Sequence, residues 1–198
     1  HICYNRFIML WPDKEVDKIE TTYKTQIGSG VPILIRDEKT ASGRVHIGSM
    51  RGACIHGITH EVLIERGIPT KFLWEINDFD PMDGLPVYLD QEKFTPYLGK
   101  LLYMVPSPDG KAKNFAEFYG EEFRGVVEGA GFAPEFYRAS ELYLSGKMNE
   151  VIKIALEKAA LIRTIYKEVS GAVREDDWLP LNVICEGCGK VSTTKATS

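Results

Sequence analysis

Apolar and polar positions alternate in two different ways over the first part of the chain. Four apolar residues recur three or four positions apart and predict an amphipathic helix from residue 11 to the glycines at 28–30: Val16, Ile19, Tyr23 and Ile27. The next residues, 31–35, form an uninterrupted apolar run rich in branched side chains, which is typical of a buried strand. Polar residues follow, so a loop is expected over 36–42.

A second helix and a second strand are predicted directly after this loop. The helix is expected from about residue 46 to residue 66, and its apolar face is expected to consist of Ile47, Met50, Cys54, Ile58 and Val62. Gly67 ends this helix and Pro69 prevents its continuation. Residues 71–76 then indicate another strand. A strand, a crossover helix and a strand predict a parallel pair with a right-handed connection, so the fold class is α/β.

The remainder of the chain mixes an irregular segment with further elements. Residues 81–112 carry five prolines and little periodicity, which indicates an irregular insertion. The pattern after this insertion predicts helices over 114–129 and 147–170, with short strands at 135–138 and 181–184. The cysteines follow the last of these strands.

These elements suggest a simple division of the chain. One α/β domain is expected over residues 11–180. Residues 181–198 are expected to be the start of a truncated cysteine knuckle. The chain begins with a histidine, and residues 1–10 are expected to be a leader or an expression remnant outside the domain.

Composition places the chain among ordinary globular proteins and excludes several classes. The 198 residues are 44% hydrophobic and 26% charged, and the net charge of −4 excludes a uniformly basic nucleic-acid coat. No uncharged apolar run approaches the roughly 20 residues that a membrane span requires. Four cysteines, two of them far apart, do not make the disulfide framework of a small secreted domain. A soluble protein of a reducing compartment, the cytoplasm, is therefore expected.

The segment 40–49 carries the residues that point to chemistry. It lies between the first strand and the crossover helix, where ligands bind in open α/β sheets and where helix amides favour phosphate oxygens. His46 can donate to a phosphate, and Gly48 leaves room for a base or a ribose against the helix. These residues predict nucleotide binding with charge stabilisation at the α-phosphate. A histidine that caps the helix or packs against it is the alternative.

Cys185 and Cys188 are spaced as half of a zinc knuckle, with glycines beside them. A zinc thiolate site needs about four ligands in a tetrahedral array, and this pair supplies two of them. A redox disulfide and an unmetallated reduced pair are the alternatives. His56 and His60 lie one helical turn apart, but no acidic partner motif accompanies them.

Two overlapping patterns in the segment 40–49 resemble known signatures. The first, Gly43-x-x-His46-Ile47-Gly48-Ser49, resembles the His-Ile-Gly-His signature of class I aminoacyl-tRNA synthetases. The second, Thr40-x-Ser42-Gly43-x-Val45-His46-x-Gly48, is similar to the class I lysyl-tRNA synthetases. Further blocks follow in the order of that family, at 78–80, 97–99, 105–108 and 136–143. The resemblance covers residues 11–190.

The resemblance implies a Rossmann-like parallel sheet with flanking helices and a lysine–tRNA ligase activity. In that activity lysine and ATP, with Mg²⁺, give lysyl-adenylate and pyrophosphate, and the lysyl group then passes to lysine tRNA. The resemblance also implies ATP contacts from Thr40, Ser42, Gly43, His46, Gly48 and Ser49. The catalytic roles fall to His46 and to Ser49, which stands where the signature has its second histidine. No membrane partner is implied.

Asp78 and Asp80 follow the second strand, on the sheet edge that also carries the His46 loop. A carboxylate there can bind the ammonium group of lysine or an ATP-bound Mg²⁺, and the alternative is an aspartate that caps the following turn. The family implies Zn²⁺ at the cysteine pair, with the remaining ligands further downstream. Ala41 and the dipeptide 38–39 depart from the residues that are usual in the family.

Class I synthetases also carry a Lys-Met-Ser-Lys-Ser-type loop, which this sequence lacks. Residues 147–149 match only two residues of that signature and begin a predicted helix. Together with half a knuckle, this predicts a fragment that ends before the second half of the nucleotide fold and the anticodon-binding domain, and that does not aminoacylate alone. Two alternatives stay open. One is another nucleotidyltransferase of the same superfamily, against which Ser49 counts, and the other is a non-catalytic synthetase-like binding module.

Overall fold

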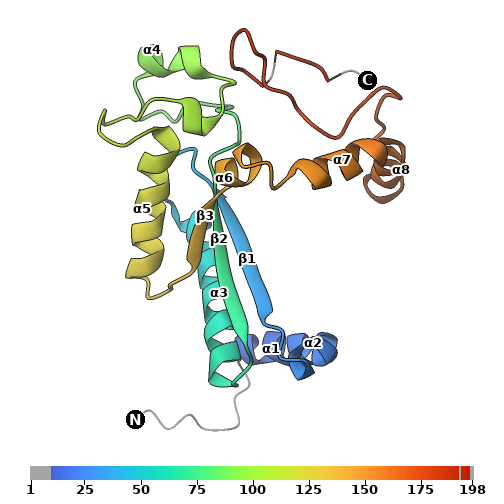
Figure 1. Ribbon diagram of the computed structural model, residues 1–198. Coiled ribbons are helices and arrows are strands. Elements are labelled where there is room, and N and C mark those ends of the chain that lie inside the picture. The colour runs from blue at the N-terminus through green and yellow to red at the C-terminus, as the bar shows by residue number, and fades with distance from the viewer. Residues whose placement is uncertain (1–9, 192, 197–198) are drawn as a thin grey trace. The chain divides into compact units, whose positions relative to one another are not determined.

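The computed structural model describes residues 10–191 and 193–196 and combines helices with a small sheet (Figure 1). The strands are β1 (Ile33–Thr40), β2 (Thr70–Asn77) and β3 (Glu135–Arg138). The helices are α1 (Trp11–Thr22), α2 (Lys24–Gly28), α3 (Ile47–Glu65), α4 (Gln91–Phe94), α5 (Phe115–Gly129), α6 (Ala139–Leu144), α7 (Asn149–Glu157) and α8 (Ala159–Ser170). Two 3-10 turns cover Thr95–Tyr97 and Leu102–Met104. Apart from Leu10, the expected leader over 1–10 lies outside the described residues.

The described chain forms two compact units that both draw on separate stretches of sequence. The first unit contains the chain up to Lys39 together with 44–76 and 119–137. The second contains 40–43, 77–118 and the chain from Arg138 onward. Both units contain residues of the domain expected over 11–180, and the bounds of that domain stay a prediction.

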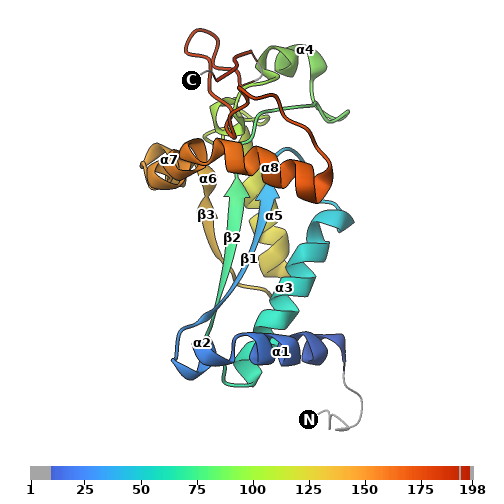
Figure 2. The same ribbon diagram turned by 90° about the vertical axis from the view of Figure 1, so that its right-hand side faces the viewer.

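The sheet has the order β1-β2-β3, with β2 in the middle and the strands parallel (Figure 2). Helix α3 connects β1 to β2, so the predicted strand–helix–strand unit is confirmed. On one face of the sheet, Trp74 packs against Phe123 of α5 with 5.2 Å between ring centroids, and Phe72 packs against the ring of His60 of α3. Trp74 and Phe123 are fully buried, so the core of the first unit lies between the sheet and these two helices.

Strand β1 is longer than its apolar run indicates. The loop expected over 36–42 is wrong for most of its length, because pairing continues to Thr40. The backbone amide of Ile33 donates to the carbonyl of Pro69 at one end, and the amide of Ala41 donates to the carbonyl of Asn77 at the other, at 2.8 and 3.2 Å. The ladder of backbone hydrogen bonds with β2 therefore continues through polar side chains that the apolar pattern excludes.

The first predicted helix is divided at Tyr23, into α1 and α2. Val16 is buried, but Tyr23 is half exposed, so the apolar stripe does not continue as predicted. The residues before the break are Thr21 and Thr22, and threonine and tyrosine have low helix propensity. Arg66, which follows α3, donates to carboxylates of α1 at 2.6, 2.8 and 3.2 Å.

The apolar face predicted for α3 is wrong. Ile47 is 91% exposed, and Cys54, which was expected on the same apolar face, is also exposed. The buried side of α3 carries Ala53, Gly57, Thr59 and Leu63. A Cβ atom on Gly57 would overlap the ring of Phe132, and one on Gly52 would overlap the carboxylate of Asp37. Small residues thus let α3 approach its neighbours closely. The buried face of α3 therefore has few large apolar residues, and the spacing of such residues does not predict it.

Residues 81–112, which were expected to be an irregular insertion, form α4 and two 3-10 turns, and several of their side chains are buried. Phe94 packs at an angle against Phe115, with 5.8 Å between ring centroids. Met82, Leu101 and Leu102 are also buried. These contacts lie in the second unit.

The helix predicted over 147–170 is interrupted at Lys158, so that α7 and α8 are separate. The pattern also missed α6, which begins directly after β3. The strand expected at 181–184 does not form, and these residues have no regular structure. No helix in the described part of the chain has both the length and the hydropathy that crossing a bilayer needs.

Candidate nucleotide-binding site

His46 is the residue at which the loop after β1 becomes helix α3. Its backbone is extended, with φ −133° and ψ 168°, and its carbonyl accepts the amide of Ser49 at 2.9 Å. The side chain makes no capping hydrogen bond, and the residue is exposed. The imidazole therefore neither caps the helix nor enters the core.

Gly48 lies directly against the imidazole of His46. A Cβ atom on Gly48 would lie 3.0 Å from both Cε1 and Nδ1 of the ring, which is tighter than ordinary contact. Glycine thus leaves room for the ring over the first turn of α3. The first amides of a helix have no intrahelical acceptor, and the helix dipole is positive at this end. An exposed imidazole and helix amides together form a surface suited to phosphate oxygens.

The start of the loop belongs to the second unit, where it contacts the segment after β2. The hydroxyl of Thr40 donates to Oδ2 of Asp80 at 3.0 Å. Both residues are partly buried, and Ala41 beside them is almost fully buried. Two residues that the sequence selected separately are therefore in contact.

Gly43 and Ser42 complete this part of the loop. A Cβ atom on Gly43 would lie 2.5 Å from the Tyr88 hydroxyl and 3.3 Å from Cγ of Pro86. The insertion thus approaches the loop closely at Gly43. Ser42 is partly exposed.

Asp78 has different surroundings from Asp80. It is only 2% exposed, and its two carboxylate oxygens accept from the backbone amide and the hydroxyl of Ser140, at 2.7 and 2.6 Å. Ser140 lies in the first turn of α6. Asp78 therefore joins the end of β2 to the N-terminus of α6, which differs from the predicted cap of the turn that follows β2.

Comparison with known proteins supplies the family. The model of the family "tRNA synthetases class I (K)" matches residues 9–198. The chain belongs to this family. A lysine–tRNA ligase of Methanosarcina barkeri is 35% identical over 158 residues, which are 80% of this chain and 29% of that protein.

A second relative matches a larger share of the chain. A lysine–tRNA ligase of Methanococcus maripaludis is 31% identical over 190 residues, which are 94% of this chain and 34% of that protein. The chain thus spans about a third of the length of the curated relatives that it matches.

In this member of the class I synthetases (K), the cysteine pair forms a tight knuckle. The amide of Gly189 donates to the carbonyl of Cys185 at 2.7 Å, and the amide of Cys185 donates to the carbonyl of Lys190 at 2.9 Å. Both thiols are free, and Sγ of Cys188 lies 3.2 Å from the hydroxyl of Thr193. The pKa of the Cys188 thiol is lowered, and the hydrogen bond with Thr193 is the largest cause. A thiol with a lowered pKa forms the thiolate more readily, and the thiolate is the form that binds a metal.

The histidines of α3 have other partners. Nδ1 of His56 lies 2.9 Å from the carboxylate of Asp37, and the ring of His60 packs on Phe72. Burial lowers the pKa of His60. Within the described residues no three metal-binding side chains gather at one place. Among the described residues the cysteine pair therefore supplies two thiols with no third metal-binding side chain beside them.

Sequence reasoning missed a polar cluster on the other face of the sheet. Glu75 of β2 is buried, accepts from the Tyr137 hydroxyl of β3 at 2.7 Å and pairs with the guanidinium of Arg36 of β1. Burial, followed by the hydrogen bond to Glu75, raises the pKa of Tyr137 to about 12. Each of the three strands contributes one member to this face, and only the order of the strands brings them together.

Proposed function

We propose that the protein to which this chain belongs is a lysine–tRNA ligase. Lysine carboxylate attacks the α-phosphate of ATP, pyrophosphate leaves, and lysyl-adenylate forms. The terminal ribose hydroxyl of lysine tRNA then attacks the lysyl carbonyl, and AMP leaves. The observation that carries this proposal is the exposed imidazole of His46 at the N-terminus of α3, in a chain of the class I synthetases (K).

The residues at the start of α3 are suited to the first step. Negative charge accumulates on the phosphates as pyrophosphate leaves, and His46 can donate to these oxygens together with the first amides of the helix. Gly48 has no side chain and the His46 ring lies against it, so the adenosine would approach this turn beside the ring. Ser49, in the same turn, offers a hydroxyl where the signature has a histidine. Ser42 and Gly43 supply backbone and hydroxyl groups before the helix.

Asp80 is the better candidate for a carboxylate that meets substrate. It is partly exposed and accepts one hydrogen bond from Thr40, so other lone pairs stay available for the lysine ammonium or for ATP-bound Mg²⁺. Asp78 was an equal candidate from the sequence. Both of its oxygens are engaged by Ser140, which argues against direct contact with substrate.

We also propose that Cys185 and Cys188 provide two of the four ligands of a Zn²⁺ ion. The knuckle and the lowered pKa of Cys188 support this choice over an unmetallated pair. The remaining ligands would come from outside the described residues. Free thiols are also expected in the reducing cytoplasm, where we place the protein.

The decisive experiment uses the full-length protein. Lysine-dependent ATP–pyrophosphate exchange is measured with lysine tRNA present, beside charging of that tRNA with labelled lysine. Both reactions are expected with lysine and not with other amino acids. His46→Ala should slow exchange roughly 10²- to 10³-fold, as loss of a transition-state phosphate contact does. Its unfolding transition should not move, because the side chain is exposed.

Three outcomes contradict the proposal. Exchange that survives His46→Ala unchanged removes the role of this histidine. Nucleotidyl transfer to a different acceptor, without lysine, indicates another nucleotidyltransferase. ATP binding or partner binding with neither exchange nor charging indicates a non-catalytic module.

A further inference from the structure

A hollow of about 340 Å³ lies between helix α8 and the segment that follows it. Three cationic side chains line it: Arg163, Lys167 and Arg174. The hydroxyl residue Thr164 and one carboxylate, that of Asp176, lie among them. All of these residues belong to the second unit, so the hollow is complete within one compact part of the chain. We call it the α8 basic hollow.

Two of the three cations are held in place by aromatic and backbone partners. The guanidinium carbon of Arg174 lies 5.1 Å from the ring centroid of Tyr166 and 5.2 Å from that of Trp178. The two rings meet edge to face, 5.7 Å apart. Nη1 of Arg163 donates to the backbone carbonyl of Trp178 at 3.0 Å. Side chains fixed in this way lose little conformational entropy when an anion binds.

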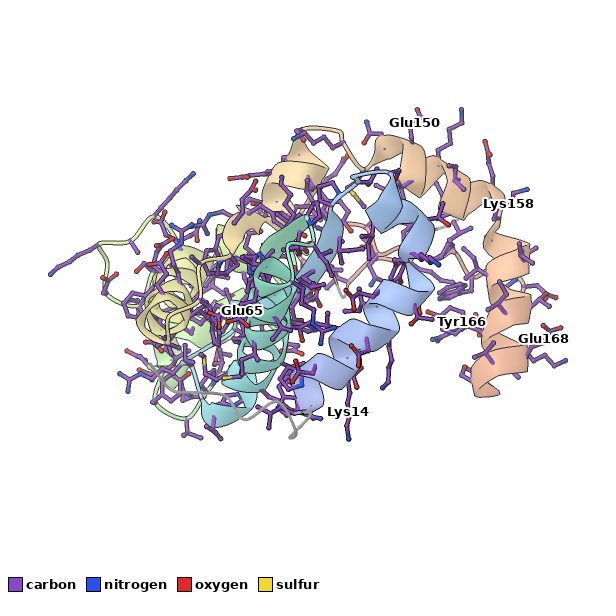
Figure 3. The ribbon with its side chains drawn as sticks, turned by 90° about the horizontal axis from the view of Figure 1, so that it is seen from below. Lys14, Glu65, Glu150, Lys158, Tyr166 and Glu168 are labelled. Carbon is purple, nitrogen blue, oxygen red and sulfur yellow. The ribbon has the colours of Figure 1, made fainter. Side chains whose placement is uncertain are left out.

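The neighbouring carboxylates compensate only part of the positive charge in the hollow, and Asp177 interacts electrostatically with Arg163. Glu175 and Asp177 both pair with Lys195, at 3.1 and 2.9 Å. Glu168 points to the opposite side of α8 from Tyr166 (Figure 3). Asp176 is the carboxylate among the lining residues, against three cations. The α8 basic hollow is therefore a site for an anion.

We propose that the α8 basic hollow binds a phosphodiester of an RNA backbone. This inference rests on the proposed function, in which tRNA is a substrate. A guanidinium presents a planar set of donors that matches phosphate oxygens, and a lysine ammonium adds a mobile point charge. A hollow lined by such groups contacts phosphate and sugar without selecting a sequence. The site would therefore position tRNA and would not read its identity.

The test compares two substitutions of opposite sign in the full-length protein. Binding of unfractionated tRNA is measured by fluorescence anisotropy at several salt concentrations. Lys167→Gln should weaken binding about fivefold near 0.1 M salt and make the slope of log Kd against log salt shallower by about 0.7–0.9, the loss of one phosphate contact. Asp176→Asn should tighten binding by a similar factor, which a folding defect would not do.

Lys153→Gln is the matched control, because it removes the same charge from an exposed lysine of α7 outside the hollow. A salt slope for Lys167→Gln equal to that of the control overturns the inference. So does an Asp176→Asn variant that binds tRNA no better than the original protein. Vesicles rich in phosphatidylserine are a further arm, and Lys167-dependent binding to them instead of tRNA would assign the hollow to a membrane surface.

These measurements separate the inference from the proposed function. Binding of mixed tRNA does not require lysine activation. A protein that binds tRNA through Lys167 but charges none with lysine contradicts only the proposed function. A protein that charges lysine tRNA with unchanged salt dependence in Lys167→Gln contradicts only the assignment of the hollow.

Discussion

Asp78 and Asp80 lie two positions apart in the sequence, yet their carboxylates have different surroundings. Both aspartates follow the end of β2, where one side chain can be buried in the protein while another stays at the surface. Asp78 is buried and bound to Ser140, whereas Asp80 is partly exposed and bound to Thr40. The sequence indicates that both are acidic groups at a strand end. Only the hydrogen bonds in the structure show that Asp78 is bound within the protein, by Ser140.

This difference predicts opposite phenotypes for the two residues. Asp78→Ala leaves the buried amide of Ser140 without its acceptor and should destabilise the region around α6 by about 1–3 kcal/mol. Asp80→Asn should leave local stability nearly unchanged, while it raises the KM for lysine or ATP at least about tenfold through loss of a charged contact. Hydrogen exchange of the α6 segment and exchange kinetics of the full-length protein measure the two effects. A stable Asp78→Ala variant with a raised KM would reverse the assignment.

Tyr137 gives a pH-dependent prediction at the same scale. Its pKa is raised from the ordinary value near 10 to about 12, chiefly by burial and then by donation to Glu75. The neutral phenol is the form that the fold favours. Its stabilising contribution is therefore fully present below pH 10 and is lost as the pH rises through about 12.

An ultraviolet titration checks this prediction. The difference in tyrosinate absorbance between the original protein and Tyr137→Phe should have its midpoint near 12. Glu75→Gln should lower that midpoint, because it removes the anionic acceptor of the phenol. A difference curve centred at 10 would show that the phenol is not in this cluster in solution.

At the scale of elements, α3 depends on glycines where it meets its neighbours. Gly57→Ala would place a methyl group against the ring of Phe132 and should destabilise α3 by about 1–3 kcal/mol, the usual cost of overpacking. Gly125→Ala in α5 is the matched control, because its Cβ would meet nothing within 4 Å. There the higher helix propensity of alanine should stabilise by up to about 1 kcal/mol. Hydrogen-exchange protection of α3 and α5 measures both changes, and equal effects would contradict the packing argument.

The elements that could be predicted from the sequence are those whose pattern reflects burial on one side. Strand β3 was predicted with its observed bounds, and β2 and α5 to within a residue at each end. The buried face of α3 was missed because it consists of small residues, as Gly57 shows. The break at Lys158 was missed because no glycine or proline marks it. The spacing of apolar residues therefore indicated that helices exist, but it did not show where a helix is interrupted or which face is buried.

At the scale of the whole molecule, the candidate site was only partly predictable. The pattern around His46 selected the residues at the start of α3, and Asp80 was expected on the same sheet edge, but its hydrogen bond with Thr40 was not predicted. The cluster around Glu75 and the α8 basic hollow each require groups from separate elements to meet. Their members have no distinctive spacing in the sequence, so no local pattern could reveal them.

The cysteine knuckle gives a prediction that involves the full-length protein. Zinc bound after dialysis should amount to about one ion per chain, and Cys185→Ser or Cys188→Ser should each release it, because a tetrahedral thiolate site does not tolerate loss of a ligand. Cys54→Ser is the matched control, since this exposed free thiol lies in α3, which belongs to the other unit, and its loss should leave the zinc content unchanged. Metal content is read by mass spectrometry. Zinc that persists in both knuckle variants, or that is missing from the original protein, would favour the reduced pair, in which the pKa of Cys188 is lowered by its hydrogen bond to Thr193 and by other neighbours in the knuckle.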